Sequence, residues 1–174
     1  EKNGNEILHE IKKMPGVQKA ELAGSLRRKK ETIGDIDIII LTGPEYRKKI
    51  VSLFTSLPQV EKILAKGTTK ASVVLKKENV QVDIRLVHDY EYGAAMLYFT
   101  GSKEHNIKLR TIARNMGYKI NEYGLFDIKS GKRVAGETEE GIYQFLNMKF
   151  IPPQQRLDKG EIEKAMLDKK TSQK

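Results

Sequence analysis

The sequence GDIDIII at positions 34–40 predicts a buried β-strand that also carries two carboxylates. Successive side chains of a strand point to opposite faces, so the alternate isoleucines would bury one face while Asp35 and Asp37 share the other. At the usual rise per residue, the Cα atoms of the two aspartates would lie about 6.6 Å apart. One divalent cation could bind both carboxylates, which makes this stretch a candidate metal site.

A short segment of small and basic residues, GSLRR at positions 24–28, precedes this strand. Gly24 and Gly34 could both be ordinary turn glycines that satisfy a positive φ angle. They could equally let backbone N–H groups and the Ser25 hydroxyl approach phosphate oxygens, with Arg28 offering its planar fork of donors. The segment is therefore a candidate phosphate-binding turn, and both interpretations of the glycines stay open.

A third carboxylate lies on a later predicted strand at residues 80–87, where apolar residues alternate with Gln81, Asp83 and Arg85. Asp83 is therefore expected to point away from the apolar layer. An Asp-x-Asp pair alone is more often a surface feature than a site. Three outward carboxylates, however, could hold two Mg²⁺ ions about 3.5–4 Å apart, the arrangement that activates a hydroxyl and neutralises a triphosphate in phosphoryl transfer. The pattern favours a nucleotidyl transferase.

The composition limits the chemistry that the chain can perform. Its 174 residues include 32 Lys and Arg against 23 Asp and Glu, a formal charge of +9, so polyanions are natural partners to consider. The absence of cysteine excludes disulfides, thiolate zinc sites and a cysteine nucleophile, and it suits the oxygen ligands that Mg²⁺ prefers. His9, His88 and His105 are interpreted as structural or solvent-facing rather than as a catalytic acid or base.

No apolar run approaches the roughly 20 residues that span a bilayer, and no signal peptide opens the chain. We therefore expect a soluble cytoplasmic protein with no membrane partner. The first residue is Glu1 rather than Met, so we also expect the chain to be a fragment of a longer polypeptide.

Hydrophobic periodicity predicts an α/β (α+β) fold in two lobes with a tail. The first lobe, residues 1–90, would be a mixed sheet with flanking helices: helices at 5–14 and 44–57, and strands at 17–23, 35–41, 70–77 and 80–87. The second, residues 91–157, would be a small α+β lobe: helices near 90–99, 103–116 and 138–146, and short strands over 118–136. The charged tail, residues 158–174, is expected to be a linker, helical at best.

The predicted helix at 103–116 and the residues that follow it are rich in positive charge. Against one acidic residue, Glu104, the region carries five basic ones: Lys103, Lys108, Arg110, Arg114 and Lys119. Such a face is either an ordinary solvated helix surface or a track for a nucleic-acid backbone, and the net charge leaves the two interpretations evenly balanced.

Five motifs resemble, in their order and spacing, the family X DNA polymerases, the group that includes DNA polymerase beta. They are GSLRR at 24–28, GDID at 34–37, VDIR at 82–85, YFTGS at 98–102 and NEYGLF at 121–126. The resemblance spans residues 5–157. Its specific parts are YFTGS and NEY, because the glycine-serine and Asp-x-Asp motifs belong to the wider nucleotidyl transferase superfamily. The sequences GSKEHN at 101–106 and IPP at 151–153 look like the bacterial or archaeal branch.

The resemblance implies a nucleotidyl transferase palm followed by a nucleotide-selecting thumb. In the palm, Asp35, Asp37 and Asp83 match the carboxylates that bind two Mg²⁺ ions, with Mn²⁺ as a substitute. Asp83 would bind only the catalytic metal and would be a candidate acceptor of the primer 3′-hydroxyl proton.

For the incoming deoxynucleotide (dNTP), the resemblance implies contacts from both lobes. Ser25 and Arg28 match triphosphate contacts, beside Gly24 and Gly34. Three further residues match the segment that packs on the sugar and disfavours a 2′-hydroxyl: Tyr98, Phe99 and Gly101. Asn106 matches a minor-groove contact to the incoming base. The Gly101–Ser102 peptide bond is cis in the best-known relatives and is expected to be cis here.

For primer–template or gapped DNA, Arg110 matches a template-strand contact, Lys70 is expected near the duplex, and Lys108 of the basic helix is a further predicted contact. Arg85 and Glu122 match a pair linked to the open-to-closed switch. One residue departs from the pattern. Lys103 stands where DNA polymerase beta has an acidic residue, so here it would meet the triphosphate or base by charge attraction.

The predicted function is template-directed addition of dNTPs to a primer 3′ end, with release of pyrophosphate, in short gaps met during DNA repair in a prokaryotic cell, at the nucleoid. Two alternatives remain: a catalytically weak fragment that binds nucleotide and DNA, and a non-templated nucleotidyl transferase. The family's N-terminal lyase and helical DNA-binding parts have no counterpart in the sequence, nor has the phosphoesterase domain that commonly follows in prokaryotic members. We expect these parts in a full-length protein.

Overall fold

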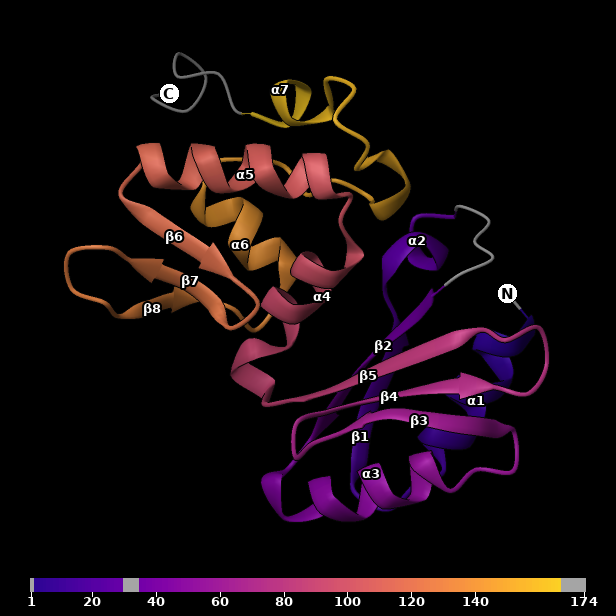
Figure 1. The fold of residues 1–174 in the computed structure, drawn as a ribbon. Coiled ribbons are helices and arrows are strands. Elements are labelled where there is room, and N and C mark those ends of the chain that lie inside the picture. Colours follow the sequence, from indigo (N-terminus) through magenta and orange to yellow (C-terminus); the bar gives the residue numbers. More distant parts are fainter. Residues whose placement is uncertain (1, 30–34, 167–174) are drawn as a thin grey trace. The chain divides into compact units, whose positions relative to one another are not determined.

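Two compact units make up the chain, Glu1–Asp89 and Tyr90–Lys174, in a computed structural model that describes residues 2–29 and 35–166 (Figure 1). No helix in the described ranges is both long enough and apolar enough to cross a membrane.

The first unit is built on a five-stranded mixed sheet with the strand order β1-β2-β5-β4-β3. β2 and β5 are parallel neighbours, whereas the other neighbouring pairs are antiparallel. The strands are β1 (Val17–Leu22), β2 (Asp35–Thr42), β3 (Val60–Lys66), β4 (Lys70–Leu75) and β5 (Gln81–Val87). The helices are α1 (Lys2–Lys12), α2 (Gly24–Arg27), the 3₁₀ turn η1 (Pro44–Tyr46) and α3 (Arg47–Thr55). The predicted palm-type mixed sheet with flanking helices is confirmed.

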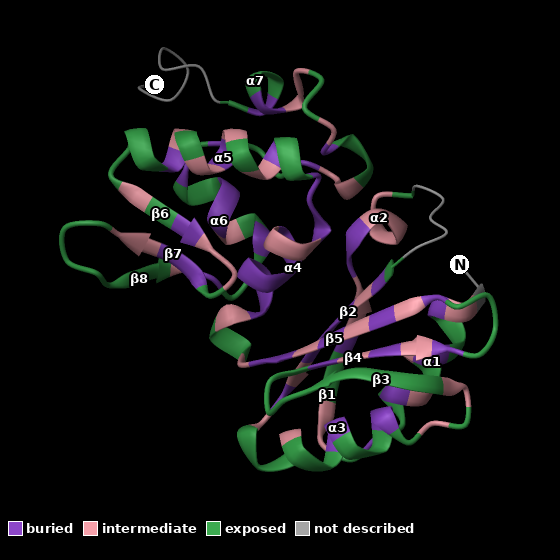
Figure 2. Ribbon diagram, in the orientation of Figure 1, coloured by how far each residue is buried: buried purple, intermediate pink, exposed green. Residues whose placement is uncertain are grey.

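The core of this unit lies between one face of the sheet and helices α1 and α3 (Figure 2). The alternate isoleucines of β2, which include Ile38, pack there at no more than 3% exposure with Ile84 of β5. Ile11 of α1 and Phe54 of α3 close the same core. Because strand side chains alternate, the outward carboxylates of β2 lie on the opposite face from the two helices.

Three local features of the first unit differ from the sequence-based expectation. The basic turn begins with a single helical turn, α2, rather than with irregular chain. β3 was not predicted, because the sequence VEKILAK does not alternate, and nearly all of this edge strand is exposed. The predicted helix at 44–57 begins as the 3₁₀ turn η1, in which Tyr46 is 40% exposed.

The second unit packs four helices with a three-stranded antiparallel sheet, β6-β7-β8. The strands are β6 (Tyr118–Asn121), β7 (Gly124–Asp127) and β8 (Arg133–Ala135). The helices are α4 (Tyr92–Thr100), α5 (Lys103–Asn115), α6 (Glu139–Phe145) and α7 (Glu161–Ala165), with short 3₁₀ turns η2 (Asp89–Glu91) and η3 (Pro153–Gln155).

The core of the second unit includes part of the segment expected to be a linker. Leu97 of α4, Leu109 of α5 and Tyr143 of α6 are among its fully buried members. Ile162 and Ala165 of α7 belong to the same apolar cluster. Residues 161–165 therefore form a packed helix of this unit, and residues 167–174 lie outside the described part.

Candidate active site

The two central strands of the first unit bring the predicted carboxylates together. β2 and β5 run parallel, and their register places Asp37 directly beside Asp83. Asp35 pairs with Gln81 two positions earlier on the same two strands. Since the isoleucines turn the other way into the core, all three carboxylates share the outward face, with Asp37 and Asp83 half-buried and Asp35 exposed.

The electrostatics of this cluster centre on Asp37. Burial, followed by repulsion from Asp83 and Asp35, raises the pKa of Asp37 from 3.8 to about 6, while Arg85 opposes the shift. Asp83 accepts one hydrogen bond, from Gln81 Nε2 to Oδ1 at 3.0 Å. At Asp37, burial and repulsion between the carboxylates therefore outweigh the attraction of Arg85.

A close approach of backbone to carboxylate explains the glycine ahead of β2. Gly24 has a φ of +65°, and a Cβ added to it would lie 2.7 Å from Asp37 Oδ2. The Ala23 N–H, just before it, donates to the Asp37 backbone oxygen at 2.8 Å. The start of α2 is thereby fixed against the carboxylate, with Ser25 and Arg28 half-buried on the residues that follow. Gly34, predicted beside them, lies outside the described residues.

The donor set suits a hard divalent cation. Carboxylate oxygens are the ligands that Mg²⁺ prefers, and a cation would relieve the repulsion that raises the pKa of Asp37. Within residues 2–29 and 35–166, no group of three or more His, Asp or Glu side chains is already gathered tightly enough to hold a metal ion. The residues present therefore fit a metal by chemistry and charge rather than as a preformed cage.

The second unit collects the predicted sugar and base contacts around the join of α4 and α5. The Gly101–Ser102 peptide bond is cis, as the resemblance implied. Tyr98 and Phe99 make an edge-on ring contact with centroids 4.9 Å apart. Asn106 Nδ2 donates to the Tyr98 carbonyl at 2.8 Å, whereas Asn106 Oδ1 is buried and has no partner among the described residues. Asn106 thus has one buried acceptor that no described residue satisfies.

The remaining predicted contacts lie on several elements. Lys103 is exposed at the first position of α5. Lys70 is exposed and opens β4, where it pairs in register with Arg85 of β5. Glu122 lies in the turn between β6 and β7 of the second unit. Lys108, predicted as a DNA contact, forms ion pairs with Glu163 and, at 3.8 Å, with Asp158.

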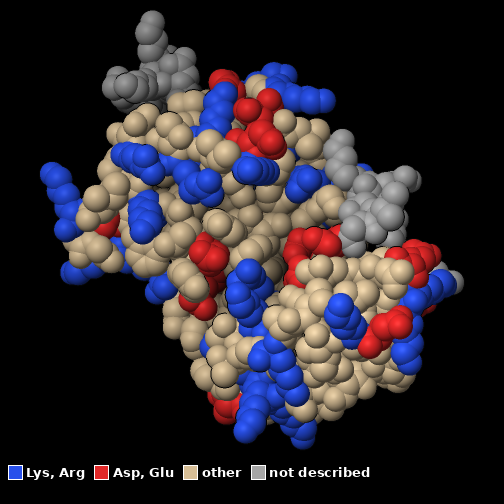
Figure 3. Space-filling view, in the orientation of Figure 1, with Lys and Arg blue, Asp and Glu red and all other residues tan. Residues whose placement is uncertain are grey.

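Basic side chains gather on the surface formed by α5 and β6 (Figure 3). Arg110, Arg114 and Lys119 line a hollow of about 280 Å³ together with Tyr118, and none of the described residues that line it is acidic. The arrangement matches the requirement for binding an anionic backbone. Among the three basic residues of this hollow, the resemblance predicted a DNA contact only for Arg110.

Sequence reasoning missed one polar cluster entirely. His105 was expected to be structural or solvent-facing, and it is fully buried with both ring nitrogens bonded, to Glu161 and to Tyr143. A carboxylate 56 residues away gives no signal of such a pairing in a single sequence.

Comparison with known families agrees with this geometry. The DNA polymerase beta palm model matches residues 1–90, and the DNA polymerase beta thumb model matches residues 95–157. The chain therefore belongs to the DNA polymerase beta family, the family X DNA polymerases, and the resemblance predicted from the five motifs is confirmed.

Three relatives show how much of such proteins the chain represents. The DNA polymerase/3′-5′ exonuclease PolX of Bacillus subtilis (strain 168) is 36% identical over 159 residues, which cover 91% of this chain and 28% of that protein. DNA polymerase lambda of Rattus norvegicus is 26% identical over 162 residues, 76% of this chain and 28% of its own length. Repair DNA polymerase X of African swine fever virus (isolate Tick/South Africa/Pretoriuskop Pr4/1996) is 28% identical over 142 residues, 77% of this chain and 79% of its length. The chain thus spans 28% of the first two relatives.

Proposed function

We propose that the chain is the palm and thumb of a DNA polymerase that adds dNTPs to a primer 3′ end under the direction of a template, in short gaps met during repair. The observation that carries the proposal is the in-register pair Asp37–Asp83 beside Gly24, in a chain that belongs to the family X polymerases. The relatives named as repair polymerases support the setting. A prokaryotic cytoplasm, with the nucleoid as the place of work, follows as part of this proposal.

Family X polymerases are metal-dependent, and here Asp35, Asp37 and Asp83 would hold two Mg²⁺ ions, with Mn²⁺ as a substitute. When bound, such ions lower the pKa of the attacking hydroxyl and neutralise charge that develops on the triphosphate. Asp83, whose Oδ1 is oriented by Gln81, would accept the proton of the primer 3′-hydroxyl. Asp37, close to Gly24, would bind in its deprotonated form.

The substrate would be oriented from both units. Ser25 and Arg28 would bind the triphosphate through a hydroxyl and a guanidinium fork, beside the small residues Gly24 and Gly34. On the second unit, the sugar would pack on the segment that contains Tyr98, Phe99 and Gly101, and Asn106 would meet the base. Lys103 would add positive charge for the triphosphate or base.

Duplex DNA would follow the basic surface of the second unit. Arg110 would contact the template strand, and Lys70 of the first unit would lie near the duplex. Lys108 would reach a phosphate only by leaving its ion pairs with Glu163 and Asp158. Arg85 and Glu122 would take part in the change from the open to the closed state.

A second candidate, a module that binds nucleotide and DNA with little turnover, has one observation in its favour. The chain spans 28% of the PolX and lambda relatives, so residues outside it contribute most of those proteins. A lyase or DNA-binding part before the palm and a phosphoesterase domain after the thumb would complete the polymerase. Detectable dNTP binding with no extension at any enzyme concentration would favour this second candidate.

Primer extension on gapped DNA, with Mg²⁺ or Mn²⁺, tests the proposal in wild type and in Asp83→Ala. We expect templated, dNTP-dependent extension by the wild type. The extension rate of the variant should fall about a thousandfold, because the substitution removes a proposed metal ligand and proton acceptor at once. Equal rates in the two proteins would remove Asp83 from the site. A product whose sequence is independent of the template would assign a non-templated transferase instead.

A further inference from the structure

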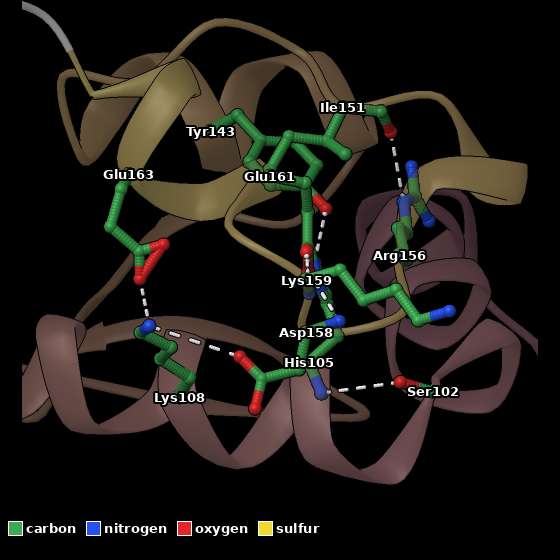
Figure 4. A network of polar contacts seen from close by, with 10 residues as sticks. All are labelled: Ser102, His105, Lys108, Tyr143, Ile151, Arg156, Asp158, Lys159, Glu161 and Glu163. Carbon is green, nitrogen blue, oxygen red and sulfur yellow. Dashed lines mark hydrogen bonds and ion pairs between the residues drawn. The ribbon is translucent and has the colours of Figure 1, made fainter.

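The first turn of α5 is tied to α6 and α7 through a buried imidazole (Figure 4). His105 is 0% exposed. Its Nδ1 lies 2.6 Å from Glu161 Oε2 on α7, and its Nε2 lies 3.0 Å from the Tyr143 hydroxyl on α6. Both polar atoms of the ring are therefore occupied, each by a different helix.

The carboxylate that meets the imidazole is itself held in place. Glu161 Oε2 accepts the Asp158 N–H at 2.9 Å, and Oε1 accepts the Lys159 N–H at 2.7 Å. Burial acts to raise the pKa of Glu161, but the hydrogen bond from His105 and the backbone donors lower it overall. Glu161 is therefore an ionised acceptor whose position is fixed by its own loop.

The protonation of the imidazole follows from its partners. Burial lowers the pKa of His105, so the ring is neutral near pH 7. An ionised carboxylate can only accept, so the single ring proton sits on Nδ1 and donates to Glu161, while the Tyr143 hydroxyl donates to Nε2. This tautomer lets the ring bridge two helices without a charge of its own.

The tether reaches the residue that precedes α5. Ser102 Oγ accepts the His105 N–H at 3.3 Å, and the Ser102 carbonyl accepts the Asn106 N–H at 3.0 Å. The Ser102 N–H in turn donates to the Arg156 carbonyl at 3.1 Å. Ser102 and His105 thus connect the beginning of α5 to the segment that runs into α7.

A buried ion pair anchors that segment to the rest of the unit. Arg156 is 0% exposed, and its Nη1 donates to Glu139 Oε2 of α6 at 2.7 Å. Its Nε donates to the Ile151 carbonyl at 2.9 Å. Glu161 therefore comes from a segment that is fixed at both ends, by this pair before it and by the burial of Ile162 after it.

We propose that Glu161, acting through His105, is a positioning residue that fixes the first turn of α5 and so sets where Asn106 and Lys103 meet the incoming nucleotide. Because Asn106 directly follows His105, a small rotation of this turn would move the Asn106 side chain. Its Oδ1 is buried and has no partner among the described residues. The inference rests on the proposed function, because it assigns Asn106 to nucleotide contact.

A matched control lies two residues further along α7. Glu163 pairs with Lys108, so it also joins α7 to α5, but both partners are exposed, at 49% and 42%. Glu161→Gln and Glu163→Gln make the same chemical change on the same helix, and only the first removes the charge that holds His105. A contact that merely attaches α7 to α5 would give both variants the same behaviour.

The first experiment measures how firmly the first turn of α5 is held, and it does not require catalysis. Amide hydrogen exchange of His105 and Asn106 is compared in wild type, Glu161→Gln and Glu163→Gln, well below the unfolding temperature. We expect exchange to accelerate about tenfold in Glu161→Gln, since each amide is protected by Ser102, and to stay at the wild-type rate in Glu163→Gln. Unchanged exchange in Glu161→Gln overturns the proposal, whether or not the protein extends primers.

The second experiment separates positioning from stability. We expect Glu161→Gln to weaken dNTP binding about tenfold and to reduce discrimination between correct and incorrect dNTPs, with DNA affinity within about twofold of wild type. A lower unfolding temperature with unchanged dNTP affinity and discrimination would make Glu161 purely structural and overturn the proposal. Wild type that binds dNTP but never extends a primer would refute the proposed function, while the comparison of dNTP affinities would still decide the role of Glu161.

A double-mutant cycle tests the route through the imidazole. If Glu161 acts through His105, then Glu161→Gln should add nothing to the loss of dNTP affinity caused by His105→Leu, and the two effects should not sum. His105→Asn, which keeps an N–H near the position of Nδ1, should rescue part of the affinity. Additive effects would contradict the proposal. If Glu161→Gln folds poorly, His105→Leu removes the same contact from the side of the ring, and unchanged exchange of the first turn of α5 in that variant would contradict the proposal equally.

Discussion

Each unit has a partly buried carboxylate at the centre of its polar cluster, and the pKa values of the two carboxylates shift in opposite directions. Asp37 lies between other carboxylates, and burial with this repulsion raises its pKa to about 6. Burial also acts to raise the pKa of Glu161, but four hydrogen-bond donors, the His105 ring and three backbone N–H groups, lower it overall. A carboxylate whose pKa is raised by neighbouring carboxylates is a candidate ligand for a cation. A carboxylate whose oxygens are bonded to donors of its own fold has a structural role.

The largest effect should come from removing the charge of Asp37. Asp37→Asn should reduce primer extension by about a thousandfold, because one of the three carboxylates that would hold the metal ions disappears. The metal-free protein should nevertheless unfold at a higher temperature, since the repulsion with Asp83 and Asp35 is gone. Extension assays and thermal unfolding in EDTA measure the two effects. A lower unfolding temperature would mean that Asp37 is satisfied like Glu161, and the contrast between the units would fail.

The pH dependence of metal binding should sharpen the same contrast. The folded chain keeps the Asp37 proton up to a pH of about 6, whereas the unfolded chain releases it near 3.8. The metal-free protein therefore loses stability as the pH rises between these values. Mg²⁺ binds the ionised form, so its stabilising effect should be small near pH 5 and large above about pH 7.

Thermal unfolding with Mg²⁺ and with EDTA across this range measures the effect. Asp37→Asn serves as the control and should show little dependence of the Mg²⁺ effect on pH. An equal gain in wild type at the two ends of the range would contradict the raised pKa.

Acid should act on the second unit in the opposite direction. The pKa of Glu161 is lowered from 4.5 and that of His105 from 6.5. Both groups therefore contribute stability near pH 7 that is lost as the pH falls, first below the ordinary range of His105 and then through the folded pKa of Glu161. Glu161→Gln should cost roughly 1–3 kcal/mol at neutral pH, and the difference from wild type should shrink in acid.

Amide exchange of α5 and α7 as a function of pH, corrected for intrinsic rates, reports the opening free energy of this unit. A difference that grows in acid would show that the Glu161 carboxylate is not stabilised by its donors.

The smallest effect should fall on the basic hollow of the second unit. Arg114→Ala with Lys119→Ala should weaken DNA binding and reduce its salt dependence, with the slope of log K against log salt falling by about one for each phosphate that the variant no longer binds. Lys48→Ala, an exposed lysine on α3, serves as the control. DNA binding measured at several salt concentrations tests this. An unchanged slope would make the hollow an ordinary solvated surface, one of the two interpretations that the sequence left open.

The first unit was the easier of the two to predict, because its signals are local. Alternation in β2 separates Asp35 and Asp37 from the core within seven residues of sequence. The register that sets Asp37 beside Asp83 is not local, since it depends on the order of strands in the sheet. The family resemblance supplied that link where periodicity could not.

Each feature that the sequence did not reveal has its own physical cause. β3 is an exposed edge strand, so no buried face imposes alternation on its sequence. α7 has five residues and two buried ones, too short for helical periodicity to stand out in a charged segment. His105 and Glu161 are 56 residues apart in the sequence and meet only in the folded chain. The sequence around either residue therefore does not predict the contact.

The packing of α7 has a practical consequence for where this chain can be divided. The thumb match ends at residue 157, yet Ile162, Ala165 and the acceptor for His105 lie beyond it. A chain cut at residue 157 would expose an apolar surface and leave the buried His105 ring without an acceptor for its N–H. The folding unit therefore extends to residue 166 at least, and a domain exchange with a relative should place its junction after that point.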